Sequence, residues 1–471
     1  MSTGPRPPTD PKELDEMPIE TVDAVVIGMG PGGEDLAGRL ARAGLAVVGV
    51  EGRLLGGECP YYACVPTKMM VRAAESLAEA HRVDQLAGSA RVQPDWAPVA
   101  TRIRDDATNN WDDTAAVERF EKAGGRFVRG WGRISAPGEV TVATTEGPRM
   151  FRATRAIVLN PGTAPMIPPI EGLADTPYWT NREAVTTTRV PDSLIVLGGG
   201  PVGMEFAQVF SRFGAAVTAV VRSRILPKEE PEVIELVSKV LADEGITLRT
   251  GVETTRVEHD GERFTVHLSE GEPLRAQGLL VATGRRTDLS ALGIGAIGLD
   301  EHARGIEVDD HLRAAEGVWA IGDVTGHGAF THMSMYQARI AAADILGAAT
   351  EPARYHAVPR VTFTDPEVGA VGMTEAQARA AGLTVRTAVT DLATSTRGWI
   401  HKAGNAGLIK LVEDAERGVL VGATSVGPVG GEVLSALAVA VHAAVPTATL
   451  REMIYAYPTF HRAIETALNE L

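Results

Sequence analysis

The stretch VDAVVIGMGPGG at residues 22–33 decides the fold. Its first six residues form a β-branched, apolar run of the kind that makes a buried strand, and the glycine-rich turn after it leads into a helical stretch ending near Ala43. A second apolar run, Leu45–Val50, follows at once. The sequence therefore predicts a strand, a helix and a second strand in succession.

Three glycines and one acid in this unit predict a bound dinucleotide. Gly28, Gly30 and Gly33 form a GxGxxG pattern between strand and helix, where the first two let the backbone approach a pyrophosphate and the third lets the helix pack closely. Glu51 ends the second strand, where a carboxylate can accept hydrogen bonds from ribose hydroxyls. A tight turn without a ligand is the alternative interpretation.

A second unit of the same kind follows later in the chain. A strand at Leu194–Leu197 precedes Gly198, Gly200 and Gly203, and a helix then leads to a strand at Ala215–Val221. The spacing between the units is too wide for a solenoid repeat, so it predicts two separate doubly wound domains and two bound dinucleotides.

The second unit differs from the first at the end of its second strand. No acid stands there; Arg222 and Arg224 follow instead. A guanidinium pairs well with a 2′-phosphate, which a carboxylate would repel, so we expect NADPH rather than NADH. These arginines could alternatively be solvated surface charges.

The bulk composition limits the partners of the chain. The 471 residues carry a formal net charge of -15, with 44% hydrophobic and 22% charged residues. Such a chain is typical of soluble globular proteins, and its charge disfavours nucleic acid and membrane surfaces. Residues 1–20 are rich in proline and charge and lack the apolar middle of a secretory signal, so we expect a flexible tail and a cytoplasmic location.

The only two cysteines, Cys59 and Cys64, lie in the segment GGECPYYACVPTK. A cysteine at a helix N-terminus gains stability as a thiolate, and such a pair suggests redox chemistry. Positions five apart diverge on a straight helix, but Pro60 and Pro66 can reshape the helix start. Half of a metal site and two inert thiols are the alternatives; no further ligand cluster follows, so we expect no metal.

Six segments in order carry a family resemblance: VIGMGPGG, GGECPYYACVPTK, VLGGGPVGMEFA, LLVATGRRTD, VWAIGDVTG and FTDPEVGAVGMT. With these, the chain resembles the FAD-dependent pyridine nucleotide-disulfide oxidoreductases, which include lipoamide dehydrogenase, glutathione reductase and mercuric reductase. The resemblance spans nearly all of residues 20–471.

The resemblance implies a role for several residues. Asp323 would hold a ribityl hydroxyl of FAD, and Lys68 would pair with Glu205 near the reactive nitrogen of the flavin. Cys64 would face the flavin ring, and Cys59 would meet the acceptor. Gly284, in LLVATGRRTD, would be a further cofactor-binding position. Electrons would pass from NADPH through FAD to the cysteine pair and then to a small-molecule acceptor.

The resemblance also implies the architecture. The fold class is α/β, with two Rossmann-like dinucleotide-binding domains and an α+β C-terminal dimerisation domain that completes the active site of a homodimer. The expected bounds are 21–155 and 288–355 for the FAD-binding domain, 156–287 for the NAD(P)H-binding domain and 356–471 for the C-terminal domain.

The C-terminal segment YAYPTFHRAIE departs from the family pattern. Lipoamide and glutathione reductases have an HxHPxxxE-like signature there, whose second histidine and glutamate form an acid-base dyad. Tyr457 stands at the histidine position and Arg462 at the glutamate position. A phenol is a poor base at neutral pH. We expect a helix from about Pro458, which would leave His461 one turn from Tyr457 as a possible substitute base; a packed or surface histidine is the alternative.

These departures leave three functions open. The intact cysteine pair favours an NADPH-dependent reductase of a disulfide or other thiol-reactive compound. The lost dyad favours a quinone reductase or diaphorase with direct transfer from the flavin. A non-catalytic flavoprotein scaffold is the third. A further departure, LNPGT at Leu159–Thr163, stands where the family reads ATG, and mercury reduction is disfavoured because no C-terminal cysteine pair exists.

Overall fold

The computed structural model describes residues 18–471. The chain splits into two compact units. One comprises the chain up to Pro66, Arg104–Ala164 and Arg285–Tyr355; the other comprises Thr67–Ile103, Pro165–Gly284 and His356–Leu471. Most of the tail predicted for residues 1–20 lies outside the described residues, but Ile19 and Glu20 already belong to the first strand.

An eight-stranded sheet forms the centre of the first unit. Its main path runs β16, β17, β6, β1, β2 and β3, and β5 pairs with both β4 and β6. The strands are β1 (Ile19–Ile27), β2 (Val47–Glu51), β3 (Arg126–Arg129), β4 (Trp131–Ala136), β5 (Glu139–Thr144), β6 (Gly147–Leu159), β16 (Arg313–Ala315) and β17 (Val318–Ala320). The four neighbours β17, β6, β1 and β2 pair in parallel, as the strand-helix-strand pattern predicts.

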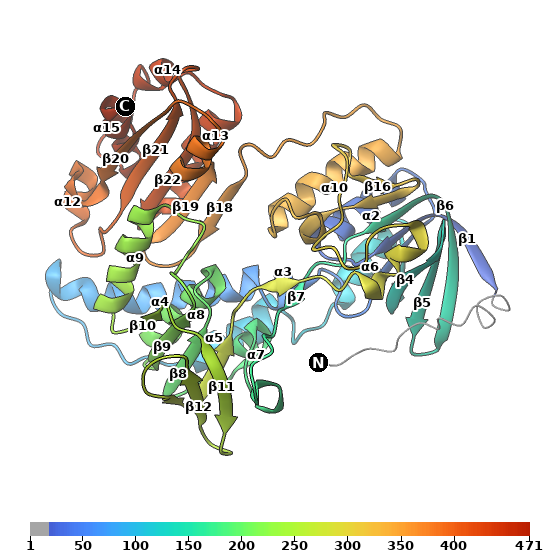
Figure 1. The fold of residues 1–471 in the computed structure, drawn as a ribbon, viewed down its shortest axis with the longest axis horizontal. Helices are drawn as coiled ribbons and strands as arrows, with labels where there is room; N and C mark the ends of the chain where they lie inside the picture. The colour runs from blue at the N-terminus through green and yellow to red at the C-terminus, as the bar shows by residue number, and fades with distance from the viewer. Residues whose placement is uncertain (1–17) are drawn as a thin grey trace. The chain divides into compact units, whose positions relative to one another are not determined.

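Two apolar cores lie on opposite faces of this sheet. Because successive strand residues point to opposite faces, Val26 packs in one core and Val25 in the other. The helices α2 (Pro31–Arg42) and α10 (Thr331–Ile345) cover the face of Val26 and lie against each other (Figure 1). The shorter helices of this unit are α3 (Glu58–Tyr61) and α6 (Thr114–Lys122).

The second unit contains the second nucleotide fold. Its parallel sheet has the order β10, β9, β8 and β14, and an antiparallel sheet of β11, β12 and β13 accompanies it. The elements are α7 (Asn181–Thr186), β8 (Ser193–Leu197), α8 (Pro201–Arg212), β9 (Ala216–Val221), α9 (Pro231–Asp243), β10 (Thr247–Thr250), β11 (Thr254–His259), β12 (Phe264–Leu268), β13 (Leu274–Ala276) and β14 (Gly278–Val281). Strand, glycine turn and helix therefore recur as predicted. A two-stranded sheet pairs β7 (Ala164–Pro165), where the chain passes from the first unit to the second, with β15 (Arg285–Arg286), where it returns to the first.

Residues 67–103 lie in the second compact unit, whereas the predicted FAD-binding domain includes them; the predicted domain bounds stay a prediction. This segment holds most of α4 (Cys64–Arg82) and α5 (Ala97–Arg102). The ring of Trp96 lies 5.4 Å from the tilted ring of Phe210 and 4.8 Å from the ring of Phe213, which meets it edge-on; both partners come from the α8 region. Aromatic burial of this size holds the segment on the second nucleotide fold.

Strand β6 continues past residue 155, where the first segment of the FAD-binding domain is predicted to end. β6 continues to Leu159 in parallel register with β1, so the crossover follows Leu159 and not residue 155. The apolar run that ends β6 is buried and stays in the sheet to its end. The assignment of a function to each domain stays a prediction.

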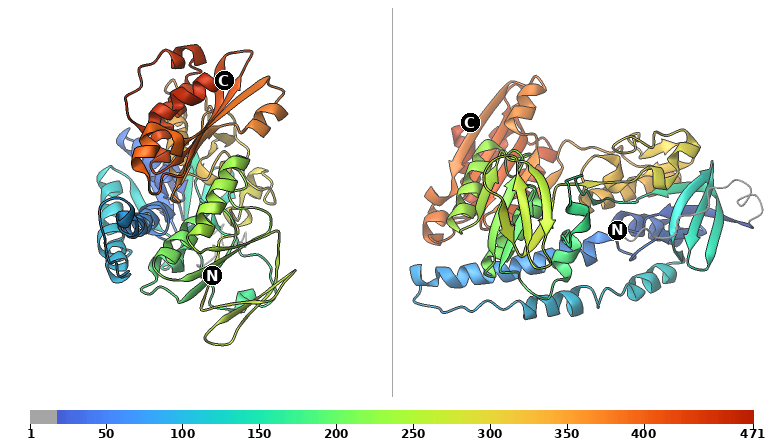
Figure 2. Two further views of the ribbon diagram at one scale, coloured as in Figure 1. Left: turned by 90° about the vertical axis from the view of Figure 1, so that its left-hand side faces the viewer. Right: turned by 60° about the horizontal axis from the view of Figure 1, so that its bottom comes forward.

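The C-terminal residues form an antiparallel sheet of order β18, β19, β22, β21 and β20. Its elements are β18 (Pro359–Thr362), β19 (Glu367–Gly372), α11 (Glu375–Ala380), β20 (Val385–Asp391), α12 (Thr396–His401), β21 (Leu408–Asp414), β22 (Val419–Gly427), α13 (Gly430–His442), α14 (Thr447–Arg451) and α15 (Ala463–Glu470). Ile409 and Leu411 face the apolar core with α13 and α15, so Lys410 between them points to the other face. Figure 2 shows the same sheet from two further sides.

The last helix begins later than predicted. α15 starts at Ala463, after a short 3₁₀ turn at Phe460–Arg462, and the helix predicted from Pro458 is wrong in its first turn. Thr459 caps the turn by accepting a hydrogen bond from the Arg462 backbone N–H at 3.2 Å. The apolar face of the helix is buried as its spacing predicts. Among residues 18–471, no helix has the length and apolar character to cross a membrane.

Candidate active site

The first glycine turn has the geometry of a pyrophosphate cradle. Gly28 has a φ of +93°, and a Cβ there would overlap the carbonyl group of Asn160. A Cβ at Gly33 would overlap the carbonyl oxygen of Gly28, so only glycine lets α2 approach the strand this closely. Gly30 caps α2 without a side chain, which leaves the first N–H groups of the helix to a ligand. These residues fit a dinucleotide.

Glu51 lies at the same turn. Its Oε2 accepts a hydrogen bond from the Met29 backbone N–H at 3.0 Å, and its Oε1 accepts one from Arg53 at 2.8 Å. Burial raises the pKa of Glu51, and the two N–H donors and nearby arginines offset part of this rise. The carboxylate is therefore held beside the glycine turn, where a ribose hydroxyl could reach it.

Asp323 takes part in a chain of polar contacts within the first unit. Thr163 donates its hydroxyl hydrogen bond to Asp323 Oδ2 at 2.7 Å, and Arg285 Nε donates to Thr163 Oγ1 at 2.8 Å. Arg285 also pairs with Glu58 Oε2 at 3.8 Å. Glu58 is the neighbour of Cys59 in sequence, so the chain connects the segment of Asp323 with the cysteine segment. Sequence reasoning did not find Thr163 or Arg285.

Asn160, in the segment LNPGT, connects the ends of three elements. Its backbone N–H donates to the Ile27 carbonyl, continuing the pairing of β1 and β6. Its Nδ2 donates to the Gly28 carbonyl at 3.1 Å, and its Oδ1 accepts from the Ser334 hydroxyl at 3.2 Å. A Cβ at Gly322 would also overlap this Oδ1. The departure from ATG therefore places a buried amide between the first glycine turn, the turn before Asp323 and α10.

Cys59 and Cys64 lie on two consecutive helices. Cys59 is in α3, Cys64 is the first residue of α4, and Tyr62 interrupts the helical path with a φ of -139°. The two cysteines therefore do not lie on one straight helix, so the divergence expected of such a helix does not apply. Cys64 is exposed, and its Sγ lies 3.5 Å from the hydroxyl of Thr331, the first residue of α10. The start of α4 and the start of α10 thus meet at one sulfur, and both favour a thiolate.

Lys68 and Glu205 form the predicted pair. Lys68 Nζ lies 2.5 Å from Glu205 Oε2, and the other carboxylate oxygen accepts the Phe363 backbone N–H at 2.9 Å. The Lys68 ammonium also lies 4.5 Å from the ring centroid of Phe363. Glu205 is buried, and the ion pair with Lys68 offsets part of the cost of burying its carboxylate. Sequence reasoning missed Phe363, which has no local signal for this contact.

The second glycine turn repeats the features of the first. Gly198 has a φ of +115°, a Cβ at Gly203 would overlap the Gly198 carbonyl, and Gly200 caps α8 with open space at its Cβ position. Gly284 has a φ of +125° and accepts the Met166 N–H through its carbonyl.

Two exposed arginines follow β9. Arg222 and Arg224 lie directly after Val221, at the carboxyl end of the strand, where the 2′-phosphate of a nucleotide on the glycine turn would lie. Arg224 Nη2 also donates to the Pro227 carbonyl at 3.4 Å. Their position agrees with the predicted role, which stays a prediction.

Tyr457 and His461 do not share a helix face, because Tyr457 precedes the helix. The ring of His461 lies 5.1 Å from that of Tyr455. Tyr457 is 65% exposed, and the guanidinium of Arg462 lies 5.4 Å from its ring centroid. Arg462 also pairs with Glu465 at 2.9 Å. The phenol thus has a cation beside it, and the geometry does not support His461 as its partner.

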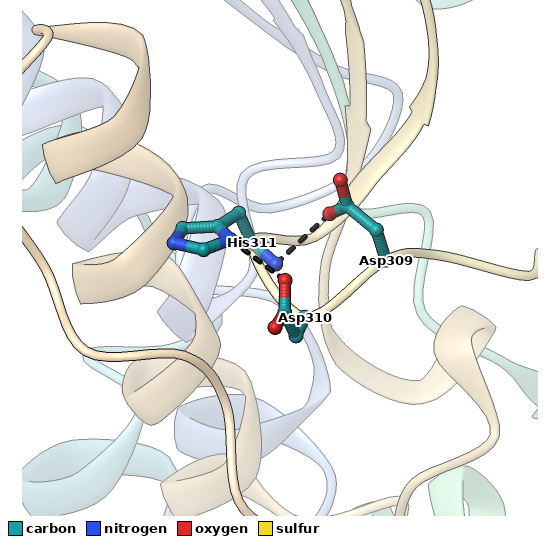
Figure 3. Close-up of side chains that lie close together, drawn as sticks. All are labelled: Asp309, Asp310 and His311. Atoms are coloured by element: carbon teal, nitrogen blue, oxygen red, sulfur yellow. Dashed lines mark hydrogen bonds and ion pairs between the residues drawn. The ribbon is translucent and has the colours of Figure 1, made fainter.

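Asp309, Asp310 and His311 form a cluster whose ligand-type atoms lie within 4.8 Å of one another (Figure 3). Asp309 Oδ1 accepts the backbone N–H groups of His311 and Arg313, each at 2.9 Å. His311 Nδ1 lies 2.7 Å from Asp310 Oδ1. The cluster is exposed and its carboxylates and imidazole serve a turn, so we assign it no metal.

Comparison with known proteins identifies the family. The model of the family described as pyridine nucleotide-disulphide oxidoreductase matches residues 22–343, and the model of its dimerisation domain matches residues 358–468. The chain belongs to this family. It is therefore an oxidoreductase of the disulfide reductase type, a class that binds FAD and a pyridine nucleotide, and the predicted fold class is confirmed.

Individual members of this family are similar to the chain over nearly their full length. The mercuric reductase of Streptomyces lividans is 32% identical over 452 residues, which cover 94% of this chain and 95% of that protein. The dihydrolipoyl dehydrogenase of Haloferax volcanii is 32% identical over 465 residues, covering 95% and 96%. The Cu(II) complex of the HOCl-induced flavoprotein disulfide reductase RclA from Escherichia coli superposes with a TM-score of 0.84 at 26% identity, covering 96% and 100%.

Replacing Asn160 by alanine should weaken FAD retention. The change leaves the Gly28 carbonyl and the Ser334 hydroxyl without their buried partner, at about 1–3 kcal/mol for each group. We expect the dissociation constant of FAD to rise about tenfold, measured from the fluorescence of the flavin that is released when the protein is diluted. Thr154→Ala is the control, because it also removes a side-chain hydrogen bond between β6 and β1, to the Val22 carbonyl, but at the far end of the strand. Equal retention in both variants would contradict the role of Asn160.

Proposed function

We propose that this enzyme takes electrons from NADPH and passes them through FAD and the Cys59–Cys64 pair to a disulfide or another thiol-reactive acceptor. The observation that carries the proposal is the meeting of two helix starts at Cys64. A thiolate there is stabilised by both helix dipoles, and an idle thiol needs no such placement.

Lys68 and Glu205 would set the charge beside the flavin. Bound FAD would supply the redox chemistry that connects hydride transfer from the nicotinamide with electron transfer to the cysteine pair. A lysine ammonium nearby favours the reduced, anionic ring. Glu205 keeps this ammonium in place through the 2.5 Å contact, and the Phe363 N–H fixes Glu205 in turn.

The choice of NADPH rests on Arg222 and Arg224. Both are exposed after β9, and no carboxylate occupies the position that Glu51 has in the first unit. A phosphate on the 2′-oxygen would find two guanidinium groups there, and each can bind it with a fork of two hydrogen bonds.

The replaced dyad limits the acceptor. A phenol is a poor base at neutral pH, so the residue at the histidine position, Tyr457, offers an attacking thiol little help. The guanidinium of Arg462 beside the phenol does not supply a proton carrier. We therefore infer that the acceptor belongs to one of two classes. The first is a disulfide with a good leaving group, such as a thiol that leaves as its anion. The second is an acceptor that binds thiolates directly.

Thiophilic metal ions belong to the second class of acceptor. Relatives are named mercuric reductase, and one solved neighbour is a Cu(II) complex of a disulfide reductase. Cys59 and Cys64 are the only cysteines of the chain, so no further pair is present to transfer mercury.

The matched dimerisation domain supports a homodimer in which each C-terminal domain completes the partner's site.

Serine in place of Cys59 or Cys64 tests the electron path. Anaerobic NADPH titration of the parent enzyme should produce thiolate-to-flavin charge-transfer absorbance, and Cys64→Ser should abolish it. Disulfide turnover should fall on the order of 1,000-fold in either variant. If both serine variants still reduce a quinone, and the parent enzyme reduces no disulfide, the enzyme is a quinone reductase instead. Absence of any flavin reduction by NADPH would indicate a scaffold.

The leaving group of the disulfide should govern the rate. Without a proton donor suited to neutral pH, an aromatic disulfide with an acidic leaving thiol should turn over at least about 100-fold faster than an alkyl disulfide, because general acid catalysis typically contributes this much. The double substitution Tyr457→His and Arg462→Glu restores the family pair and should narrow the gap. Equal rates for both disulfides in the parent enzyme would contradict this explanation.

Glutamine at both Arg222 and Arg224 should reduce the preference for NADPH. We expect KM for NADPH to rise about tenfold or more, the effect of losing one to two charge-assisted contacts, while KM for NADH stays within about twofold. Arg275→Gln serves as the control because Arg275 is an exposed arginine on β13 that forms an ion pair with Asp260. An unchanged ratio of the two KM values would remove the basis for assigning NADPH.

A further inference from the structure

The loop between β9 and α9, residues 222–230, is packed along its middle. Ile225 and Leu226 are each 1% exposed, although the arginines before them face solvent. The Leu226 N–H donates to the Gly199 carbonyl at 2.7 Å. A Cβ at Gly199 would lie 3.1 Å from the Cα of Ile225. The loop therefore lies against the second glycine turn, beside the expected nucleotide.

The end of the loop is bound to the C-terminal domain by Arg360. Glu229 is 7% exposed, and its two carboxylate oxygens accept the Nε and Nη2 hydrogen bonds of Arg360, each at 2.8 Å. Arg360 lies on β18 and also donates to the Lys228 carbonyl at 3.4 Å. A planar fork of this kind fixes direction as well as distance.

A second anchor surrounds Lys410. Lys410 is 1% exposed. Its ammonium lies 3.1 Å from a carboxylate oxygen of Glu230, 2.8 Å from one of Glu232 and 3.1 Å from one of Glu375. Burial lowers the pKa of Lys410, but the carboxylates outweigh it and the pKa is raised, so the ammonium stays charged. Glu230 Oε1 also accepts the backbone N–H of Glu375 at 2.7 Å. Figure 1 draws α9, which carries Glu232, beside the strands of the C-terminal sheet.

The contacts of Arg360 and Lys410 both run from the C-terminal domain to the acidic segment 229–232. Lys410 lies on the face of β21 opposite the apolar core of its own domain, so its ammonium faces the loop, α9 and Glu375 of α11 and not that core. The acids Glu229, Glu230 and Glu232 are consecutive apart from Pro231, so a short segment receives both anchors. A buried charge that loses its partner is strongly destabilised, so the segment has little freedom to leave.

We propose that Arg360 and Lys410 are positioning residues for the nucleotide: by holding residues 229–232 they fix the 222–230 loop so that Arg222 and Arg224 meet the 2′-phosphate of NADPH. The C-terminal domain thus has a second task besides dimerisation. This inference rests on the proposed function, because it assumes that the two arginines bind the phosphate. Preorganised donors bind more tightly because less ordering occurs on binding.

Arg360→Gln tests the anchor through two readouts. KM for NADPH should rise about fivefold to tenfold, a typical size for coupling between sites, while kcat and KM for NADH stay within about twofold. Tryptic cleavage after Arg222, Arg224 or Lys228 in the nucleotide-free holoenzyme should accelerate several-fold, because a loosened loop enters a protease more often. Arg386→Gln is the control, since Arg386 pairs with buried Glu413 in the same sheet without contacting the loop.

Glu229→Gln supplies a second variant that removes the same ion pair from the other side and is used if Arg360→Gln does not fold. Unchanged cleavage and unchanged KM for NADPH in the folded variant would overturn the inference. Faster cleavage with unchanged KM would also overturn it, and the arginine double variant then shows where the error lies. If Arg222→Gln with Arg224→Gln still shifts the nucleotide preference, only the anchor is wrong; if it does not, the proposed phosphate site is wrong as well.

Discussion

The parallel register of three strands positions the part of the candidate site around the first glycine turn. β1, β6 and β17 end together, because the register pairs Ile27 with Leu159 and Leu159 with Ala320. The residues just beyond, among them Gly28 and Asn160, must then meet at one edge of the sheet. Open parallel sheets bind ligands at this edge. The glycine turn, the amide of Asn160 and the turn before Asp323 depend on this register.

Much of this could be predicted because it is encoded locally. The two strand, turn and helix units follow from apolar runs and glycine spacing, and their bounds in the structure differ by a few residues from those predicted. The pair of Lys68 and Glu205 came from family resemblance alone, and the 2.5 Å contact agrees with it. The break between the helices of Cys59 and Cys64 follows from the prolines around them.

The remaining features depend on contacts between residues far apart in sequence. Nothing near Asn160 indicates that its amide meets Ser334, and nothing near Cys64 points to Thr331. The segment 67–103 follows the first nucleotide unit in sequence but is held by aromatic packing on the second, which no local pattern reveals. The last helix begins later than predicted because Thr459 caps a 3₁₀ turn at Phe460–Arg462 that precedes it.

The anchored loop has a consequence for protein engineering. Nucleotide preference is commonly altered by exchanging the segment after the second strand of the nucleotide fold. Here such an exchange that omits Glu229 and Glu230 would leave Arg360 without its carboxylate partner and would take one of the three carboxylates away from Lys410. A graft from another reductase must therefore include the acids, or replace the two cations at the same time. The unit of exchange is a pair of segments from two domains, and not a single loop.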